Sequence, residues 1–226
     1  CTSCTVVVLD ENGKSLRPAI MWMDERAYQE AWELTATHHP QLKYGGGEAS
    51  PQWMIPKGLW LSRHEPDVFD RAYRIVEQTD YFTYRLSGEW SISQYNATSK
   101  WCYVSLNGGW SRDLIEKVSA EELVSKWPER VLQVGTPVGH IREDVAREVG
   151  LSPDTLIVQG GIDAHGGMVG LSGMGNGDVS MVLGTSTCLM AQSNTPVFAN
   201  VWGPFPDSLM KGTFTIGGGQ STTGAI

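Results

Sequence analysis

The sequence predicts an α/β protein. Short apolar runs typical of strands alternate with segments of helical periodicity from the start of the chain to its end, which is the pattern of α/β folds. The chain of 226 residues, 41% of them hydrophobic and 19% charged, is long enough to bury a sizeable core in one large domain or two modest ones. Turns rich in glycine separate the runs, and residues 45–47 are expected to form a flexible connection.

The first predicted elements are a hairpin and a helix. Residues 6–10 and 16–22 have the composition of strands, and the Asn-Gly turn between them is a strong hairpin signal. Asp24 is then expected to cap a helix that runs to about Thr37. The buried face of this helix is predicted to contain Ala27, Ala31 and Leu34.

The middle of the chain adds one strand and several helices. Ser50-Pro51 has the form of a helix start, but Pro56 would interrupt that helix, so residues 52–55 are predicted to be an irregular turn before a helix continues at Lys57. A short strand is expected at residues 74–77. Helices are predicted near residues 67–72, 79–86, 111–118 and 142–149, the last closed by Gly150.

An acidic residue follows the next predicted strand. The apolar run 155–158 ends in paired glycines and is predicted to be a buried strand that delivers Asp163 near its carboxyl end, where α/β folds bind ligands. Small residues on both sides of Asp163 let another molecule approach the backbone closely. Asp163 equally fits the cap of a helix that starts at Ala164. The two interpretations are compatible, and both stay open.

A polar turn lies a short distance further on. Residues 178–183 have the pattern of a strand, and the apolar pattern resumes at residues 188–191. The turn between them, residues 184–187, can offer backbone amides and hydroxyl groups to phosphate oxygens. An ordinary hairpin rich in serine and threonine explains the same four residues.

The charge and the cysteines restrict the class of ligand. The net charge of −8 and the absence of a cluster of basic residues argue against binding to nucleic acid or to an anionic membrane, so a small ligand is expected. There is no apolar run of about 18 residues and no basic leader before the first strand. Cys1 and Cys4 have CxxC spacing without a second pair, so we predict no metal site and a reduced, cytoplasmic protein.

Several segments together resemble a known family. These segments are residues 20–27, 46–57, 79–88, 160–165, 183–187, 202–204 and 218–221. In this order they are similar to the FGGY carbohydrate kinases, and within that family to the ribulokinase-like members. The resemblance covers nearly the whole chain. It implies an actin-like ATPase fold made of RNase H-like domains, with a cleft between the two domains.

The resemblance also implies roles for particular residues. Asp163 matches the family's catalytic base. The family associates the segments of Lys57 and Asp24 with the sugar, although a solvated lysine and a helix cap are equally open. Further sugar contacts are expected at Gln52 and Trp53 in the ribulokinase-like segment and at His165 beside the base, and a packed or solvated ring is the alternative for His165. The nucleotide and its phosphates are expected to meet Gly184, Thr185, Ser186, Thr187 and Gly219.

The chain departs from the family pattern at two places. Ribulokinase-like members carry an acid immediately before the Gly-Gly-Gln turn, where this chain has Gly217. The pattern around the lysine expects small or hydroxyl-bearing residues where this chain has Gln52 and Met54. Both departures concern the identity of the sugar and not the class of reaction.

The resemblance implies a division of the chain. Residues 1–172 are expected to be the sugar-binding N-terminal domain without its first strand and phosphate loop, residues 173–177 a junction, and residues 178–226 the start of the nucleotide-binding C-terminal domain. The chain therefore reads as a piece of a longer protein. We expect the 226 residues alone not to turn over ATP, and ribulose-dependent release of ADP would contradict this.

The leading functional hypothesis is a kinase that uses ATP and Mg²⁺ to phosphorylate a ketopentose such as ribulose at its 5-hydroxyl. Alternatives are a kinase for xylulose, glycerol or erythritol, and a non-catalytic sugar-binding relative, for which Gly217 is the best support. A hydrolase using Asp163 and His165 lacks an accompanying motif. The expected partner is a sugar or polyol, without nucleic acid or membrane, and a homodimer is left open.

Overall fold

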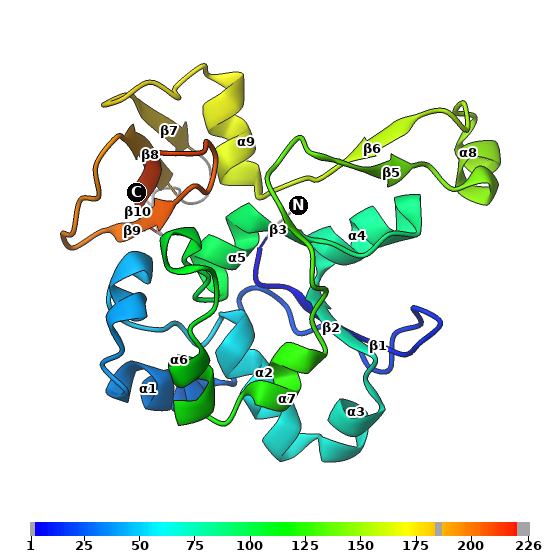
Figure 1. Cartoon of the computed structure of the whole chain (residues 1–226), viewed down its shortest axis with the longest axis horizontal. Coiled ribbons are helices and arrows are strands. Elements are labelled where there is room, and N and C mark those ends of the chain that lie inside the picture. The colour runs from blue at the N-terminus through cyan, green and yellow to red at the C-terminus, as the bar shows by residue number, and fades with distance from the viewer. Residues whose placement is uncertain (1–2, 184–186, 221–226) are drawn as a thin grey trace.

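The computed structural model of the chain describes residues 3–183 and 187–220, and its mixture of helices and strands confirms the α/β class (Figure 1). The strands are β1 (Val6–Leu9), β2 (Arg74–Glu77), β3 (Ile92–Ser93), β4 (Val131–Leu132), β5 (Pro137–His140), β6 (Leu156–Val158), β7 (Val179–Leu183), β8 (Thr187–Ser193), β9 (Trp202–Pro206) and β10 (Phe214–Gln220). The helices are α1 (Tyr28–Ala36), α2 (Met54–His64), α3 (Pro66–Arg71), α4 (Gln78–Ser87), α5 (Gln94–Lys100), α6 (Arg112–Lys117), α7 (Glu121–Ser125), α8 (Glu143–Val149) and α9 (Asp163–Gly170), with 3₁₀ turns η1 (Pro40–Gly45) and η2 (Ser105–Asn107).

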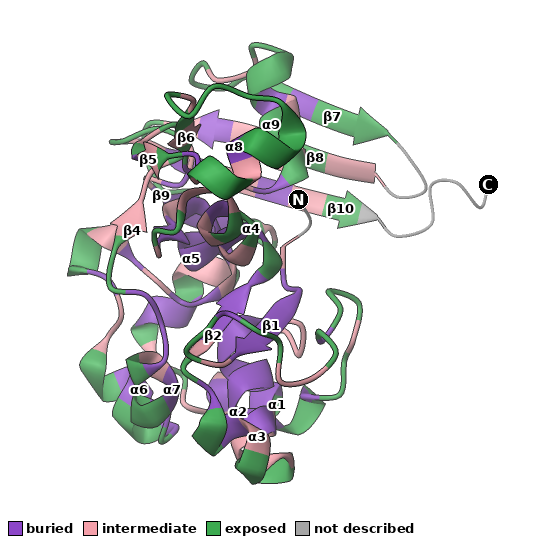
Figure 2. Cartoon of the chain, turned by 90° about the vertical axis from the view of Figure 1, so that its right-hand side faces the viewer, coloured by how far each residue is buried: buried purple, intermediate pink, exposed green. Residues whose placement is uncertain are grey.

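The centre of the N-terminal part is the pair β1 and β2. The two strands are antiparallel, with Val6 opposite Glu77 and Leu9 opposite Arg74. Apolar side chains of β1, β2 and α2 are buried together, and Figure 2 shows these elements almost entirely in the buried colour. Burial of this apolar surface is the main force that holds the helices against the two strands.

The predicted N-terminal hairpin is only partly formed. After β1 the chain turns back, but it meets β1 only through isolated bridges, Val6 with Ile20 and Leu9 with Ser15. The prediction of a regular second strand at residues 16–22 is therefore wrong. Pro18 lies in this stretch and has no amide hydrogen to donate to a ladder.

The first helix begins later than predicted. Its N-cap is Ala27 and not Asp24, whose carboxylate is occupied by the backbone amide of Arg26 at 3.0 Å and by the Arg26 guanidinium at 2.9 and 2.7 Å. The predicted buried face is confirmed, since Ala27, Ala31 and Leu34 are all buried.

The helix α2 corrects the prediction of an irregular turn at residues 52–55. It starts at Met54, so Pro56 is its third residue. The first four amides of a helix have no partner within the helix, so a proline there costs no hydrogen bond. The helix also places Gly58 against Leu123 of α7, where no room remains for a larger residue.

The remaining helices were predicted with mixed success. Those near residues 67–72, 79–86, 111–118 and 142–149 are confirmed as α3, α4, α6 and α8, and Gly150 closes α8 in the left-handed conformation. The sequence did not predict α5 or α7. Five consecutive residues of α5 are buried, so the helix has no polar face and shows no amphipathic period.

The strand before Asp163 is present but is not buried. Among the described residues the strand β6 pairs with β5 alone, and its Leu156 and Val158 are 50% and 45% exposed. The prediction of a buried strand is therefore wrong on burial and right on position. The helix α9 starts directly after it, with Asp163 as the first residue and Ile162 as the N-cap.

The C-terminal strands form one antiparallel sheet in the order β7-β8-β10-β9. The predicted hairpin is confirmed by the pairing of β7 with β8, which ends at Leu183 opposite Thr187. The division of the chain at residues 173–177 stays a prediction. Within residues 3–183 and 187–220, no helix has the length and apolar character required to cross a bilayer.

Candidate functional site

A groove of about 520 Å³ lies between the N-terminal part and the C-terminal sheet. Its walls are the segment 45–53, the end of α5 and strands β9 and β10. The 3₁₀ turn η1 and β9 are in contact beside it, as Figure 1 shows for the blue and orange segments. The groove brings together three residues predicted from the sequence, Gln52, Trp53 and Gly219.

Two glycines of β10 that line the groove, Gly218 and Gly219, differ in how closely other atoms pack against them. Gly219 packs tightly, because a Cβ atom there would overlap the Trp202 ring and lie 3.1 Å from the Thr187 carbonyl oxygen. A Cβ at Gly218 would meet nothing within 4 Å. The backbone at Gly218 is therefore open to a ligand, and Thr187 lies beside Gly219.

The neighbouring Gly217, one of the two departures from the family pattern, packs against Met190. A Cβ atom at this position would lie 2.5 Å from the Met190 sulfur and 3.1 Å from the Leu189 carbonyl oxygen. The thioether of Met190 fills the space in which an acidic side chain would begin. An acid at position 217 would therefore require the Met190 side chain to move to another rotamer.

The groove has two charged side chains among the described residues that line it, Glu48 and Lys100. Glu48 is exposed and lies in the segment that resembles ribulokinases. Lys100 lies in the last turn of α5 beside Ser99, whose side chain is 3% exposed. The sequence analysis missed both α5 residues because the helix that positions them has no periodic signal.

Asp163 lies close to the groove without lining it. Its side chain is exposed at the start of α9, and its Oδ1 accepts one hydrogen bond from the Ala164 amide at 2.8 Å. The helix is in contact with β7 and β8. Burial raises the pKa of the Cys188 thiol of β8. The charge of Lys100 lowers this pKa and the charge of Asp163 raises it, so both charged groups lie near Cys188. Cys188 is paired with Gly219 of the groove, so Asp163 and the groove adjoin the same strands.

Lys57 is buried in the N-terminal part. Its Nζ donates hydrogen bonds to the carbonyl oxygens of Cys4 and Met21, both at 2.7 Å, and burial lowers its pKa. The Arg26 guanidinium holds the pKa of Asp24 below its usual range, and the charge of Lys57 acts in the same direction. The charges of Lys57 and Asp24 thus influence one another, but neither residue lines the groove, and their predicted contact with the sugar stays a prediction.

Glu77 is a buried carboxylate that the sequence analysis did not select. Glu77, at the end of β2, accepts hydrogen bonds from the Trp101 indole at 2.7 Å, the Cys4 amide at 2.9 Å and the Asn96 amide group at 3.1 Å. Burial raises its pKa, and the charges of Lys100 and Lys57 partly oppose this shift. The position of an acid at the carboxyl end of a strand was the available signal.

His165 lies inside the protein. Its ring is 5% exposed, packs against the Tyr95 ring with centroids 3.4 Å apart, and has no hydrogen-bond partner for either nitrogen within the described residues. Burial lowers the pKa of His165 to about 2, so the ring is neutral at physiological pH. It does not line the groove or bond to Asp163, and the structure gives no support to a hydrolase built on this pair.

The turn predicted to contact phosphate is only partly described. Gly184, Thr185 and Ser186 lie outside the described residues, and Thr187 is the first residue of β8. In the part of the chain that the structure describes, no three His, Cys, Asp or Glu side chains gather as a metal site. Cys4, Cys102 and Cys188 are free thiols.

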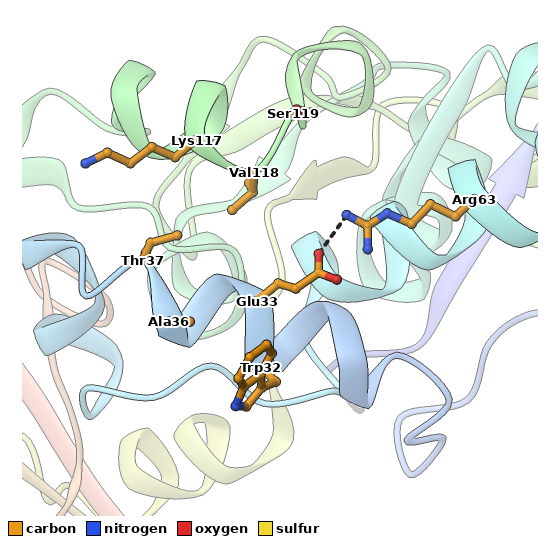
Figure 3. A pocket seen from close by; sticks show the side chains of 8 residues that line it. All are labelled: Trp32, Glu33, Ala36, Thr37, Arg63, Lys117, Val118 and Ser119. Atoms are coloured by element: carbon orange, nitrogen blue, oxygen red, sulfur yellow. Dashed lines mark ion pairs between the residues drawn. The ribbon is translucent and has the colours of Figure 1, made fainter.

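A second cavity, of about 450 Å³, lies between α1, α2 and α6 (Figure 3). Its cations are already paired, Arg63 with Glu33 at 2.8 Å and Lys117 with Asp113 at 3.3 Å. It contains none of the residues predicted to bind sugar or nucleotide. The groove beside β10 is therefore the candidate site.

Comparison with known proteins identifies the family of this chain. Residues 2–170 match the N-terminal domain of the FGGY family of carbohydrate kinases. The chain is 31% identical over 253 residues to an FGGY carbohydrate kinase domain-containing protein of Homo sapiens, covering 99% of this chain and 46% of the relative. It is 30% identical over 245 residues to a D-ribulokinase of Saccharomyces cerevisiae, covering 92% and 34%. The chain thus spans less than half the length of these curated relatives.

Solved structures confirm the predicted fold. A xylulose kinase from Rhodospirillum rubrum has a TM-score of 0.82 and 23% identity, covering 98% of this chain and 45% of its own. A glycerol kinase from Plasmodium falciparum, solved with ADP, has a TM-score of 0.82 and 18% identity, covering 99% and 46%. These neighbours share the actin-like arrangement expected from the sequence.

Proposed function

Since the chain belongs to the FGGY family of carbohydrate kinases, we propose that its protein transfers the terminal phosphoryl group of ATP to a hydroxyl group of a ketopentose such as ribulose, forming the 5-phosphate. The observation that carries the proposal is the groove, which joins Gln52 and Trp53 to Gly219 beside the helix that begins at Asp163. The named D-ribulokinase relative favours this sugar.

In the proposed reaction, Asp163 acts as the base. A sugar hydroxyl is a weak nucleophile, and a carboxylate within hydrogen-bond reach orients it and takes its proton. The bond from the sugar oxygen to the γ-phosphorus forms, and the bond from that phosphorus to the bridging oxygen of ATP breaks, so ADP leaves. Asp163 is exposed and holds only the Ala164 amide among the described residues, so its carboxylate can accept this proton.

The sugar is expected to lie along the aromatic side of the groove. Trp202 is 46% exposed there and offers an apolar ring face, while Gln52 offers an amide group. The turn 184–187 and Gly219 are proposed to face the nucleotide. Mg²⁺, which neutralises phosphate charge when bound, is proposed to enter on the phosphates of ATP, since the described residues hold no metal cluster of their own.

The direct test is ATP-dependent phosphorylation by the protein in its natural length. We expect activity with a ketopentose from a panel that also contains xylulose, glycerol and erythritol. Asp163→Asn is expected to lower kcat by roughly 100-fold or more, with the Michaelis constant for sugar little changed. Asp154→Asn, an exposed acid outside the groove, is the control and is expected to be fully active. Near-normal turnover by Asp163→Asn would remove the base assignment, and a preference for a polyol would redirect the proposal to that substrate.

We also propose a cytoplasmic enzyme, in keeping with the free thiols of Cys4 and Cys102.

A further inference from the structure

Asp163 lies between two elements that hold it weakly. The strand β6 before it has three residues and, among the described residues, pairs with β5 alone. The helix α9 has three glycines among its eight residues, Gly166, Gly167 and Gly170, and each glycine in a helix costs about 1 kcal/mol relative to alanine. A fixed position for Asp163 therefore depends on contacts that this segment makes with the rest of the protein.

Gln159 makes the strongest of these contacts. It follows β6 directly, four residues before Asp163, and it is 0% exposed. Its Oε1 accepts a hydrogen bond from the Ser91 hydroxyl at 2.6 Å, and its amide group donates to Asp80 Oδ1 at 3.4 Å. One side chain thus ties the exit of β6 to two other segments of the chain.

Both partners of the Gln159 side chain belong to the interior. Asp80 in α4 and Ser91 before β3 are 0% exposed, and Asp80 Oδ1 also accepts a hydrogen bond from the Ser93 amide at 2.9 Å. The backbone of Gln159 is bonded to residues 135–136 through its amide at 2.8 Å and its carbonyl oxygen at 2.9 Å. Gln159 is therefore held to the interior by both its backbone and its side chain.

The residues on either side of Asp163 face the same interior. A Cβ atom at Gly161 would lie 2.9 Å from Val134 and 3.5 Å from the Tyr95 ring, so the backbone there packs closely. Two residues after Asp163, the buried ring of His165 packs on the same Tyr95 ring. Asp163 itself is exposed. The segment therefore faces the interior on one side and presents the Asp163 carboxylate on the other.

A role of Gln159 in stability alone accounts for less of this arrangement. Burying an amide group is unfavourable unless hydrogen bonds compensate it, and an apolar side chain of the same size would fill the space without that cost. Asp80 does not depend on Gln159 as a donor, because its Oδ1 accepts the shorter hydrogen bond from Ser93. What the Gln159 side chain adds is direction, since its two hydrogen bonds fix where the chain leaves β6.

We propose that Gln159 is a positioning residue for Asp163, holding the segment between β6 and α9 where the Asp163 carboxylate meets the sugar hydroxyl. The inference rests on the proposed function, in which Asp163 is the base. Because Gln159 is completely buried, it acts through Asp163 and does not touch the substrate. A displacement of about 1 Å in a reacting group lowers the rate by up to about 100-fold, so small shifts of this segment affect turnover.

The test uses phosphorylation by the protein in its natural length. Gln159→Met keeps the size of the side chain and removes both hydrogen bonds, so we expect kcat to fall roughly tenfold or more while the Michaelis constants for sugar and ATP change little. Ser91→Ala is expected to act in the same direction. The double variant should lose no more than the weaker of the two single variants, because both changes remove the same hydrogen bond.

The matched control is Gln192→Met. Gln192 is a glutamine near the end of β8 that is 2% exposed and is bonded to the hydroxyl groups of Thr215 at 2.9 Å and Thr213 at 3.2 Å. Its replacement also removes two hydrogen bonds, but it lies away from the segment that carries Asp163. We expect Gln192→Met to keep the kcat of the parent.

A second measurement separates positioning from general damage. Because Gln159 acts through Asp163, Gln159→Met is expected to cause no further loss of kcat in the Asp163→Asn variant. A further tenfold loss there would overturn the inference, and so would a parent-like kcat of folded Gln159→Met while Asp163→Asn is impaired. If Gln159→Met does not fold, Ser91→Ala in both backgrounds decides the question by the same criteria. The proposed function fails separately, through absence of phosphorylation by the parent.

Discussion

Lowering the pH is expected to destabilise this protein through His165. The buried ring has a pKa of about 2 in the folded protein, whereas in the unfolded chain it has the ordinary value of 6.5. Between these values the unfolded state binds more protons than the folded state, so the free energy of unfolding rises with pH. The contribution of the neutral, buried His165 ring to the free energy of unfolding is present above about pH 6.5. This contribution is lost progressively as the pH falls below that value.

The size of the effect follows from the unfolded ring alone. At about pH 5.5 that ring is roughly 90% protonated, and its protonation stabilises the unfolded state by about 1.4 kcal/mol relative to neutral pH. Because His165 is 5% exposed, solvent does not screen away the difference. Other groups titrate over the same range, so the quantity to compare is the pH response of the parent with that of His165→Leu.

The assay is urea unfolding at about pH 7.5 and about pH 5.5. The parent is expected to lose about 1.4 kcal/mol more than His165→Leu between the two conditions. His140→Leu, at an exposed position, serves as the control and should respond like the parent. Equal responses of the parent and His165→Leu would refute the conclusion that the ring is buried and neutral.

Two further substitutions test the packing around the site. Gly203→Ala is expected to lower the free energy of unfolding in urea by about 2 kcal/mol more than Gly212→Ala. Both glycines have positive φ. A Cβ atom at Gly203 would meet the Thr215 oxygen at 2.6 Å and the Phe205 nitrogen at 2.9 Å, whereas one at Gly212 would meet nothing within 4 Å. Equal losses would contradict this geometry. Lys57→Met is expected to destabilise the protein by about 1–3 kcal/mol because two buried carbonyl oxygens lose their donor, whereas Lys43→Met, at an exposed lysine, should change stability little. A thermal melt of Lys57→Met that coincides with that of the parent would show that the two bonds contribute nothing.

Local sequence signals predicted the elements that have a polar and an apolar side. The helices α3, α4, α6 and α8 lie on the surface and bury one face, so their periodicity is visible in the sequence. The helix α5 is buried on nearly every side and was missed, and with it Ser99 and Lys100. Amphipathic periodicity depends on a contrast between a polar and an apolar face of a helix. It therefore gives no signal for a helix that is buried on both faces.

The candidate site was predicted in part. Gln52, Trp53 and Gly219 do meet in one groove, and Asp163 does begin a helix next to the same sheet. Their catalytic and binding roles remain proposals. The burial of Lys57 and His165 was not predictable, because it depends on which segments cover them and not on their neighbours in the sequence.

The sequence by itself determined the α/β class, the order of the motifs that mark the family, and the position of an acid at the start of α9. Only the tertiary structure decided that the segment 45–53, the end of α5 and the strand β10 form one groove, and that Lys100 lines it. Local propensity and periodicity describe neighbours within a few residues along the chain. The groove depends on contacts between segments separated by 46 to more than 100 residues, and these are chosen by packing of the whole core.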